Sequence, residues 1–168
     1  MSTTRHIITA LLLILAQGAV DNYINLSVYL DLSLCLYILL TLPPRWGAIP
    51  SMATGFILGL AVDVLGNGIP GMTAAAMTAT GVFRRSIFNL TAPKEKEKRQ
   101  NFEAMGLRNF LLYSLPLTLI FLTVYILLDS SGFRPAGQCL ARLGISLAAN
   151  TALTAFLYTA SNDSRRKQ

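Results

Sequence analysis

The fold is decided by a stretch that reads GFILGLAVDVLGNGIPG from Gly55 to Gly71. Up to residue 65 this stretch is apolar apart from Asp63, and from residue 66 onward it holds three glycines and a proline. A continuous apolar run is typical of a membrane-spanning helix, whereas glycine and proline in this density are typical of a tight turn. The stretch therefore predicts a membrane helix that reverses sharply into the next one.

Small residues recur on both sides of this turn. Gly55 and Gly59 form a GxxxG pattern before it, and Ala75, Ala79 and Gly81 follow it. Small residues let helix backbones approach closely in lipid, where no hydrophobic force drives helices together. We therefore expect the two helices to pack as a close hairpin.

The whole chain has the composition of an integral membrane protein. Of its 168 residues 53% are apolar and only 13% are charged, and the mean hydropathy is +0.52. A soluble globular domain carries roughly a quarter charged residues, so soluble domains, disordered tails and disulfide scaffolds are excluded.

Cys35 and Cys139 both lie in apolar runs, which is typical of buried small side chains. His6 is the only histidine, so histidine-based catalysis and metal sites are not expected.

The apolar runs are continuous rather than alternating, which favours helices over barrel strands. A helix needs about 20 mostly apolar residues to cross the hydrocarbon. The sequence therefore predicts one all-α domain over residues 1–168, a transmembrane bundle of six spans with a basic cytoplasmic loop at 91–108. The expected spans are 7–23, 24–42, 47–65, 72–90, 109–128 and 136–160.

The positive charges indicate the orientation of these spans. With both termini in the cytoplasm, every lysine and arginine except Arg134 and Arg142 falls on the inner side, as the positive-inside rule requires. One alternative concerns the start of the chain, because Arg5, the following apolar run and the small residues 16–19 also fit a cleaved signal peptide. The second span begins almost at once after Asp21, which favours a helical hairpin instead.

Two charged residues lie inside apolar runs, where an unpaired charge is costly. Asp31 lies about seven residues into the second run, and Arg142 lies at a similar depth in the sixth, both in the outer half. Their opposite sign and matched depth predict an ion pair within the bundle. Alternatively, Arg142 extends to the outer interface while Asp31 is protonated or faces water.

Asp63 and Asn150 are the other polar side chains of note. The Asp63 carboxylate, just before the outer turn, could anchor that turn by accepting backbone hydrogen bonds, contact a partner protein, or be solvated at the membrane boundary. Asn150 lies midway along the sixth span and is expected to donate a hydrogen bond to another helix.

Basic residues concentrate around the inner loop, where seven of them outnumber Glu95, Glu97 and Glu103. Topology alone accounts for such a surface, and it would also attract anionic lipid or dock a cytoplasmic partner. The basic residues are Arg84, Arg85, Lys94, Lys96, Lys98, Arg99 and Arg108.

Motifs of catalysis and cofactor binding are missing from the sequence. It contains no GxxxxGK[ST], no GxGxxG between a strand and a helix, and no HExxH. The longest stretch outside the membrane, about 91–108, is too short for a nucleotide-binding or hydrolytic domain. We therefore expect no catalytic residues, no cofactor, no metal and no nucleic-acid partner.

The segment from about Tyr37 to Phe88, roughly a third of the chain, resembles a known family. A proline-rich inner turn, LPPRW at 42–46, leads to GFILGLAVDVL at 55–65, and a short turn with Gly71 follows. Next comes an alanine-rich span that begins TAAA at 73–76 and ends in FRR at 83–85. This order is similar to MreD, the rod-shape-determining membrane protein of bacteria, in the branch with a long basic inner loop seen in Bacteroidetes-type sequences.

The resemblance implies a non-enzymatic part of the machinery that elongates peptidoglycan, located in the bacterial cytoplasmic membrane. Its partners would be an MreC-like membrane protein and, directly or indirectly, the MreB-type filament and the RodA/penicillin-binding-protein synthase. The implied fold resembles the substrate-binding subunits of energy-coupling-factor transporters. Gly59, Asp63 and Gly71 match the family-signature positions, and Gly55 with Gly59 would take part in helix–helix contact with partners. Asp31 departs from the family pattern, since the second span is expected to be apolar.

Two other functions remain open at this level. A substrate-capture subunit of a small-molecule importer would share the size and the number of spans. It would need a polar pocket open to the outside, for which Asp31, Asp63 and Arg142 are the visible candidates. A membrane-embedded enzyme is the third possibility, but no histidine, cysteine or paired-acid constellation with useful spacing supports it.

Overall fold

The structure, a computed structural model, describes residues 11–20, 30–66, 69–91, 106–130 and 136–166. All regular structure in these ranges is helical. The sixth predicted span begins where α7 begins, and α3, α4 and α6 cover their predicted spans to within two residues. The helices are Leu11–Val20, α2 (Cys35–Leu40), α3 (Ala48–Leu65), α4 (Met72–Thr91), α6 (Leu107–Ser130) and α7 (Ala136–Arg166).

Three of the described helices are long and apolar enough to cross a membrane, which is the character of a membrane protein. They are Ala48–Leu65, Leu107–Ser130 and the Ala136–Ser161 part of α7. Pro116 lies inside α6 without ending it, because membrane helices tolerate proline when neighbouring groups satisfy the freed carbonyl. Helix α4 has sufficient length, but its threonines and Arg84 and Arg85 make it less apolar.

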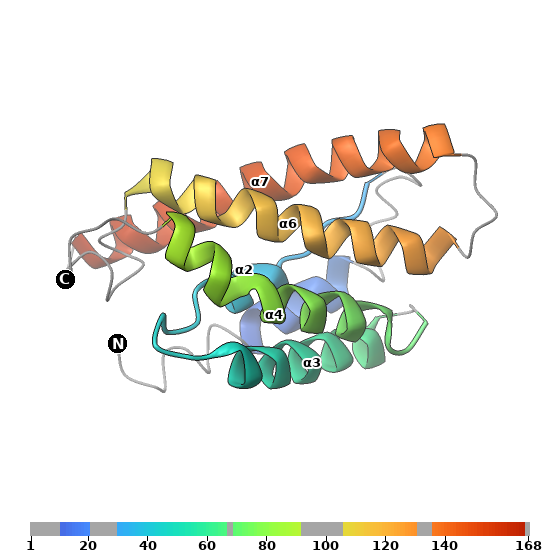
Figure 1. Ribbon diagram of the computed structural model, residues 1–168, viewed down its shortest axis with the longest axis horizontal. Helices are drawn as coiled ribbons and strands as arrows, with labels where there is room; N and C mark the ends of the chain where they lie inside the picture. The colour runs from blue at the N-terminus through green and yellow to red at the C-terminus, as the bar shows by residue number, and fades with distance from the viewer. Residues whose placement is uncertain (1–10, 21–29, 67–68, 92–105, 131–135, 167–168) are drawn as a thin grey trace.

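Successive helices run in alternating directions along one long axis (Figure 1). Helix α3 packs on α4, α4 on α6 and α6 on α7, while the short α2 lies against α3 and α4. The starts of α3 and α6 and the end of α4 therefore share one end of the bundle, which we call the basic end after Arg45, Arg85 and Arg108. The opposite end is called the acidic end after Asp31, Asp63 and Asp129.

Aromatic rings fill the core toward the basic end. Phe110 of α6 stacks on Tyr158 of α7 with ring centroids 4.3 Å apart, and it meets Tyr37 of α2 edge-on at 6.4 Å. Phe88 of α4 contacts Tyr113 at 5.6 Å. These contacts join α2, α4, α6 and α7. Stacked and edge-to-face pairs of buried rings stabilise such a core beyond the effect of the apolar area that they bury.

The second predicted span differs from expectation. Residues 24–42 were expected to form one continuous helix, but residues 30–34 have no helical structure and α2 covers only Cys35–Leu40. Aspartate and serine favour non-helical backbone because they form competing local hydrogen bonds, and Asp31 and Ser33 both lie in this stretch. The predicted connection around Asp21 lies outside the described residues.

Candidate functional site

The turn stretch forms a hairpin in which α3 and α4 touch through their backbones. A Cβ added to Gly59 would lie 2.4 Å from Cα of Ala74, and one added to Gly55 would lie 2.7 Å from the carbonyl oxygen of Met77. On α4, a Cβ at Gly81 would lie 2.8 Å from the carbonyl oxygen of Ser51. No side chain fits at these distances, so glycine is required at all three positions.

This packing corrects the expectation that Gly55 and Gly59 contact a partner. Both are buried against α4, so no other protein reaches them. Ala75 is exposed and Ala79 is half-buried, so the closest contact on α4 is made by Ala74 instead. The small-residue pattern therefore predicts the hairpin, but it does not identify a partner surface.

Asp63 joins the same two helices at the acidic end. Its carboxylate accepts hydrogen bonds from the backbone N–H groups of Gly71 (2.8 Å), Thr73 (3.1 Å) and Ala74 (3.2 Å). It thereby caps α4 from α3, since the first N–H groups of a helix have no partner within the helix. Gly71 has φ +99°, which only glycine adopts readily. Asp63 is 5% exposed, so it anchors the turn and is neither solvated nor open to a partner.

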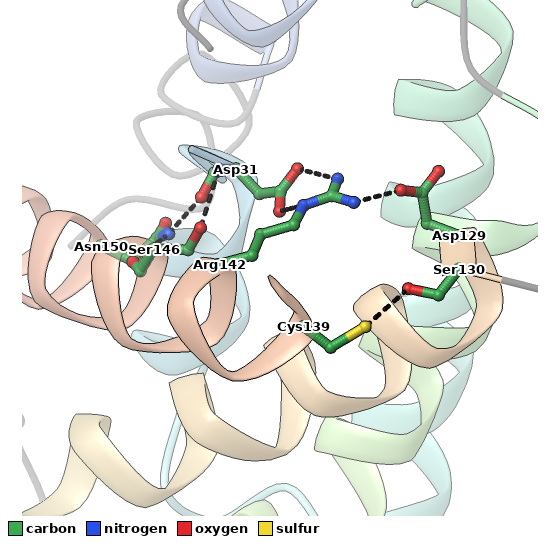
Figure 2. Close-up of polar contacts among 7 residues, drawn as sticks. All are labelled: Asp31, Asp129, Ser130, Cys139, Arg142, Ser146 and Asn150. Carbon is green, nitrogen blue, oxygen red and sulfur yellow. Dashed lines mark hydrogen bonds and ion pairs between the residues drawn. The ribbon is translucent and has the colours of Figure 1, made fainter. Parts of the chain in front are cut away.

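Arg142 is the centre of a charged cluster that joins three elements (Figure 2). Its Nε and Nη2 each donate to the carboxylate of Asp31 at 2.6 Å, and its Nη1 donates to Asp129 at the end of α6. The structure thus brings together Asp31 and Arg142 in the bidentate geometry that makes arginine–carboxylate pairs strong. The guanidinium is directed at these carboxylates, and its side chain is only 9% exposed.

Asp129 was missed by the sequence reasoning. It lies one residue beyond the predicted fifth span, so it was treated as part of the outer loop. The available signal was the hairpin between the fifth and sixth spans. A short connection brings the end of one helix beside the first turns of the next, and Arg142 lies in the second turn of α7.

Side chains of α7 hold the non-helical segment 30–34. The Asp31 N–H donates to Oγ of Ser146 at 2.9 Å, and the Ser33 N–H donates to Oδ1 of Asn150 at 2.9 Å. Asn150 in turn donates to the carbonyl of Asp31 at 2.5 Å. Figure 2 shows both α7 side chains directed at the backbone of Asp31. The predicted role of Asn150 as a donor to another element is therefore what the structure shows.

The helix Leu11–Val20 holds the same segment from a second direction. Gln17 donates through Nε2 to the carbonyl of Leu32 at 2.9 Å and accepts through Oε1 from the N–H of Leu34 at 2.7 Å. Non-helical backbone at membrane depth is tolerated only where protein satisfies its polar groups. We call Gln17, Arg142, Ser146 and Asn150 the clasp, because together they supply these contacts.

Arg84 requires a correction, because it was expected on the cytoplasmic basic surface. It is 2% exposed, and it donates to the carbonyl of Leu42 and, at 3.2 Å, to Oγ of Ser51. Tyr113 donates to the carbonyl of Leu40 at 3.1 Å. Carbonyls at the end of a helix have no helical partner, and Tyr113 binds one of them, whereas Arg84 holds the chain just beyond the C-cap of α2, Thr41.

The remaining basic residues divide into two groups. Arg85 and Arg108 are exposed at the basic end, as expected. Lys94, Lys96, Lys98 and Arg99 lie outside the described residues.

The described residues contain no group of three or more His, Cys, Asp or Glu side chains that could hold a metal ion. Their buried charged groups instead connect helices to one another: Asp63 connects α3 to α4, Arg84 connects α4 to α2, and Arg142 connects α7 to α6 and segment 30–34. Comparison with known proteins found no matching family model, no similar curated protein and no similar solved structure.

Proposed function

We propose that this chain is a non-enzymatic membrane component of the bacterial cell-elongation complex, of the MreD type. It acts by holding neighbouring membrane proteins, among them an MreC-like protein. Through them it contributes to the assembly of the MreB-type filament and the RodA/penicillin-binding-protein synthase.

One observation carries the proposal: the residues that resemble the family signature form a single structural device. Gly59 lets α4 approach α3, Asp63 caps α4, and Gly71 supplies both the positive φ and one of the N–H donors to Asp63. A motif whose members cooperate in this way is explained by a rigid hairpin. A rigid hairpin suits a protein that presents a fixed surface to others.

The outward face of α3 supplies a candidate surface. Phe56, Ile57, Leu60 and Val64 are 50%, 65%, 39% and 70% exposed and follow helical spacing. A partner membrane helix packing there would be held by van der Waals contact, since lipid already satisfies apolar groups. The proposal thus assigns partner contact to the outer face of the hairpin, while the glycines keep that face rigid.

The proposed topology is six crossings with both termini in the cytoplasm. The alternating directions of successive helices along the bundle (Figure 1) support it, as does the position of exposed Arg45, Arg85 and Arg108 at one end. Reporter fusions at the two termini test it, because an externally accessible terminus contradicts the proposed orientation.

Co-purification is the main test of the proposed function. The double variant F56A/I57A is expected to lose binding to the MreC-like protein and to round the cells, without loss of membrane insertion. A matched control removes an isoleucine and a phenylalanine of similar exposure from α7, in the variant I145A/F156A, and is expected to retain both. Normal cell shape after depletion of the protein, together with no co-purified partner, would contradict the proposal.

The importer hypothesis receives less support from the geometry. Its three candidate pocket residues, Asp31, Asp63 and Arg142, use their charged groups to bind other parts of the chain. A vitamin-type ligand would have to replace these contacts. Stabilisation of the purified protein against heating by such a ligand would revive this hypothesis.

A further inference from the structure

At the basic end, Arg45 and Trp46 lie in the turn that precedes α3, and Arg85 of α4 lies beside this turn. The turn is closed by a hydrogen bond from the Trp46 N–H to the carbonyl of Pro43 at 3.1 Å. Arg45 and Trp46 are both exposed, Trp46 to 39%. Tryptophan prefers the headgroup level of a bilayer, so this turn is suited to the membrane interface.

Arg85 reaches this turn from α4. Its Nη1 lies 3.3 Å from the position that a Cβ would occupy at Gly47, the residue that follows Trp46. Because Gly47 has no side chain, the guanidinium lies directly over the backbone between the turn and α3. Arg45 and Arg85 therefore flank the same short segment, although forty residues separate them in the sequence.

The charges around this segment favour an anion. Among the residues whose side chains the structure describes, the carboxylates are those of Asp31, Asp63 and Asp129, and each belongs to a contact at the acidic end. Neither Arg45 nor Arg85 has an ion pair or a side-chain hydrogen bond to another described residue. Two guanidinium groups that pair with no carboxylate among the described side chains are suited to a ligand that supplies phosphate oxygens.

We propose that Arg45, Trp46 and Arg85 form a binding site for the phosphate of an anionic phospholipid in the cytoplasmic leaflet. The guanidinium groups bind the phosphate, and the indole ring packs against the glycerol and the upper acyl chain. The first N–H groups of α3 add favourable charge, because Gly47 provides no side-chain cap. This inference requires a membrane setting but not the elongation partners, so the two proposals fail independently.

Trp46 makes the test direct, because it is the only tryptophan in the chain. The full-length protein is placed in phosphatidylcholine vesicles that contain brominated phosphatidylglycerol or, separately, brominated phosphatidylcholine, and quenching of Trp46 fluorescence is measured. Each basic residue near an anionic membrane contributes about fivefold to binding. We expect phosphatidylglycerol to quench preferentially, and we expect the variant R45Q/R85Q to lose that preference.

The matched control is R108Q, which removes one positive charge from the same end of the bundle but not from this turn, and is expected to retain the preference. The single variant R85Q provides a second measurement that does not depend on the folding of the double variant, and about a fivefold loss is expected. An unquenched wild type, or an equal loss in R108Q and R85Q, would overturn the proposal. Abolition of the preference by dissolved inorganic phosphate would assign the site to a free anion rather than a lipid.

Discussion

The hairpin of α3 and α4 and the segment 30–34 are held in place by opposite means. In the hairpin, side chains are missing at Gly55, Gly59 and Gly81, and the two backbones touch. In segment 30–34, the backbone is not helical, and side chains of the clasp supply the hydrogen bonds that a helix would otherwise provide. The first region depends on shape and the second depends on polar pairing.

This difference determines what each region tolerates. Where two backbones touch, no flexible side chain can move aside, so an added methyl group forces the helices apart and lowers the stability of the protein. Polar pairing can be redistributed, because Arg142 has two carboxylates and segment 30–34 is held from two sides. We therefore expect the hairpin to be the rigid part of the molecule. In the clasp, we expect a large loss of stability only when Arg142 is replaced.

The largest effect is expected from Arg142→Gln, which removes the centre of the clasp. Asp31 and Asp129 then face each other without a counter-ion, and loss of one partner of a buried ion pair costs about 3 kcal/mol or more of stability. Thermal unfolding in detergent measures the loss. Adding Asp31→Asn to this variant removes one of the two unpaired carboxylates and is expected to recover part of the stability, whereas additive losses would show that the pair is not coupled.

A smaller but clear effect is expected from Gly59→Ala in the hairpin. The new Cβ would lie 2.4 Å from Cα of Ala74, and overpacking of this kind costs about 2 kcal/mol. Gly144→Ala is the matched control, because a Cβ at this exposed position of α7 meets nothing within 4 Å. It is expected to leave the unfolding temperature unchanged or slightly raised. Equal unfolding temperatures for the two variants would contradict the close packing of α3 on α4.

The smallest effect is expected from Asp129→Asn. Arg142 retains both hydrogen bonds to Asp31 in this variant, and the Asp129 side chain is 28% exposed. The loss of stability should therefore be below about 1 kcal/mol, measured by the same unfolding experiment. A loss as large as that of Arg142→Gln would show that Asp129, rather than Asp31, is the principal partner of Arg142.

The sequence predicts the hairpin better than the clasp. Gly55, Gly59, Asp63 and Gly71 lie within one short stretch, so spacing alone indicates a close approach and a turn. The contact between Asp31 and Arg142 is also predictable, since two opposite charges at matched depth have few other partners in lipid.

The non-helical backbone of segment 30–34 was not predictable from hydropathy, because residues 24–42 are equally apolar whether or not they form a helix. The deciding groups, Gln17 and Asn150, are distant in sequence from the backbone that they bind. Arg84 was misplaced for a related reason. Counting charges by loop does not reveal that the end of α2 offers carbonyl groups close to the fourth span.

The long reach of the clasp also bears on biogenesis. Hydrogen bonds join Asp31 to Ser146 and Ser33 to Asn150 across 115 and 117 residues of chain, and α7 is synthesised after every other described helix. During translation, the backbone N–H groups of Asp31 and Ser33 therefore lack these acceptors until α7 has been made, whereas α3 and α4 can pack as soon as both have been synthesised. Segment 30–34 therefore reaches its described arrangement only after α7, the last of the described helices, has been synthesised.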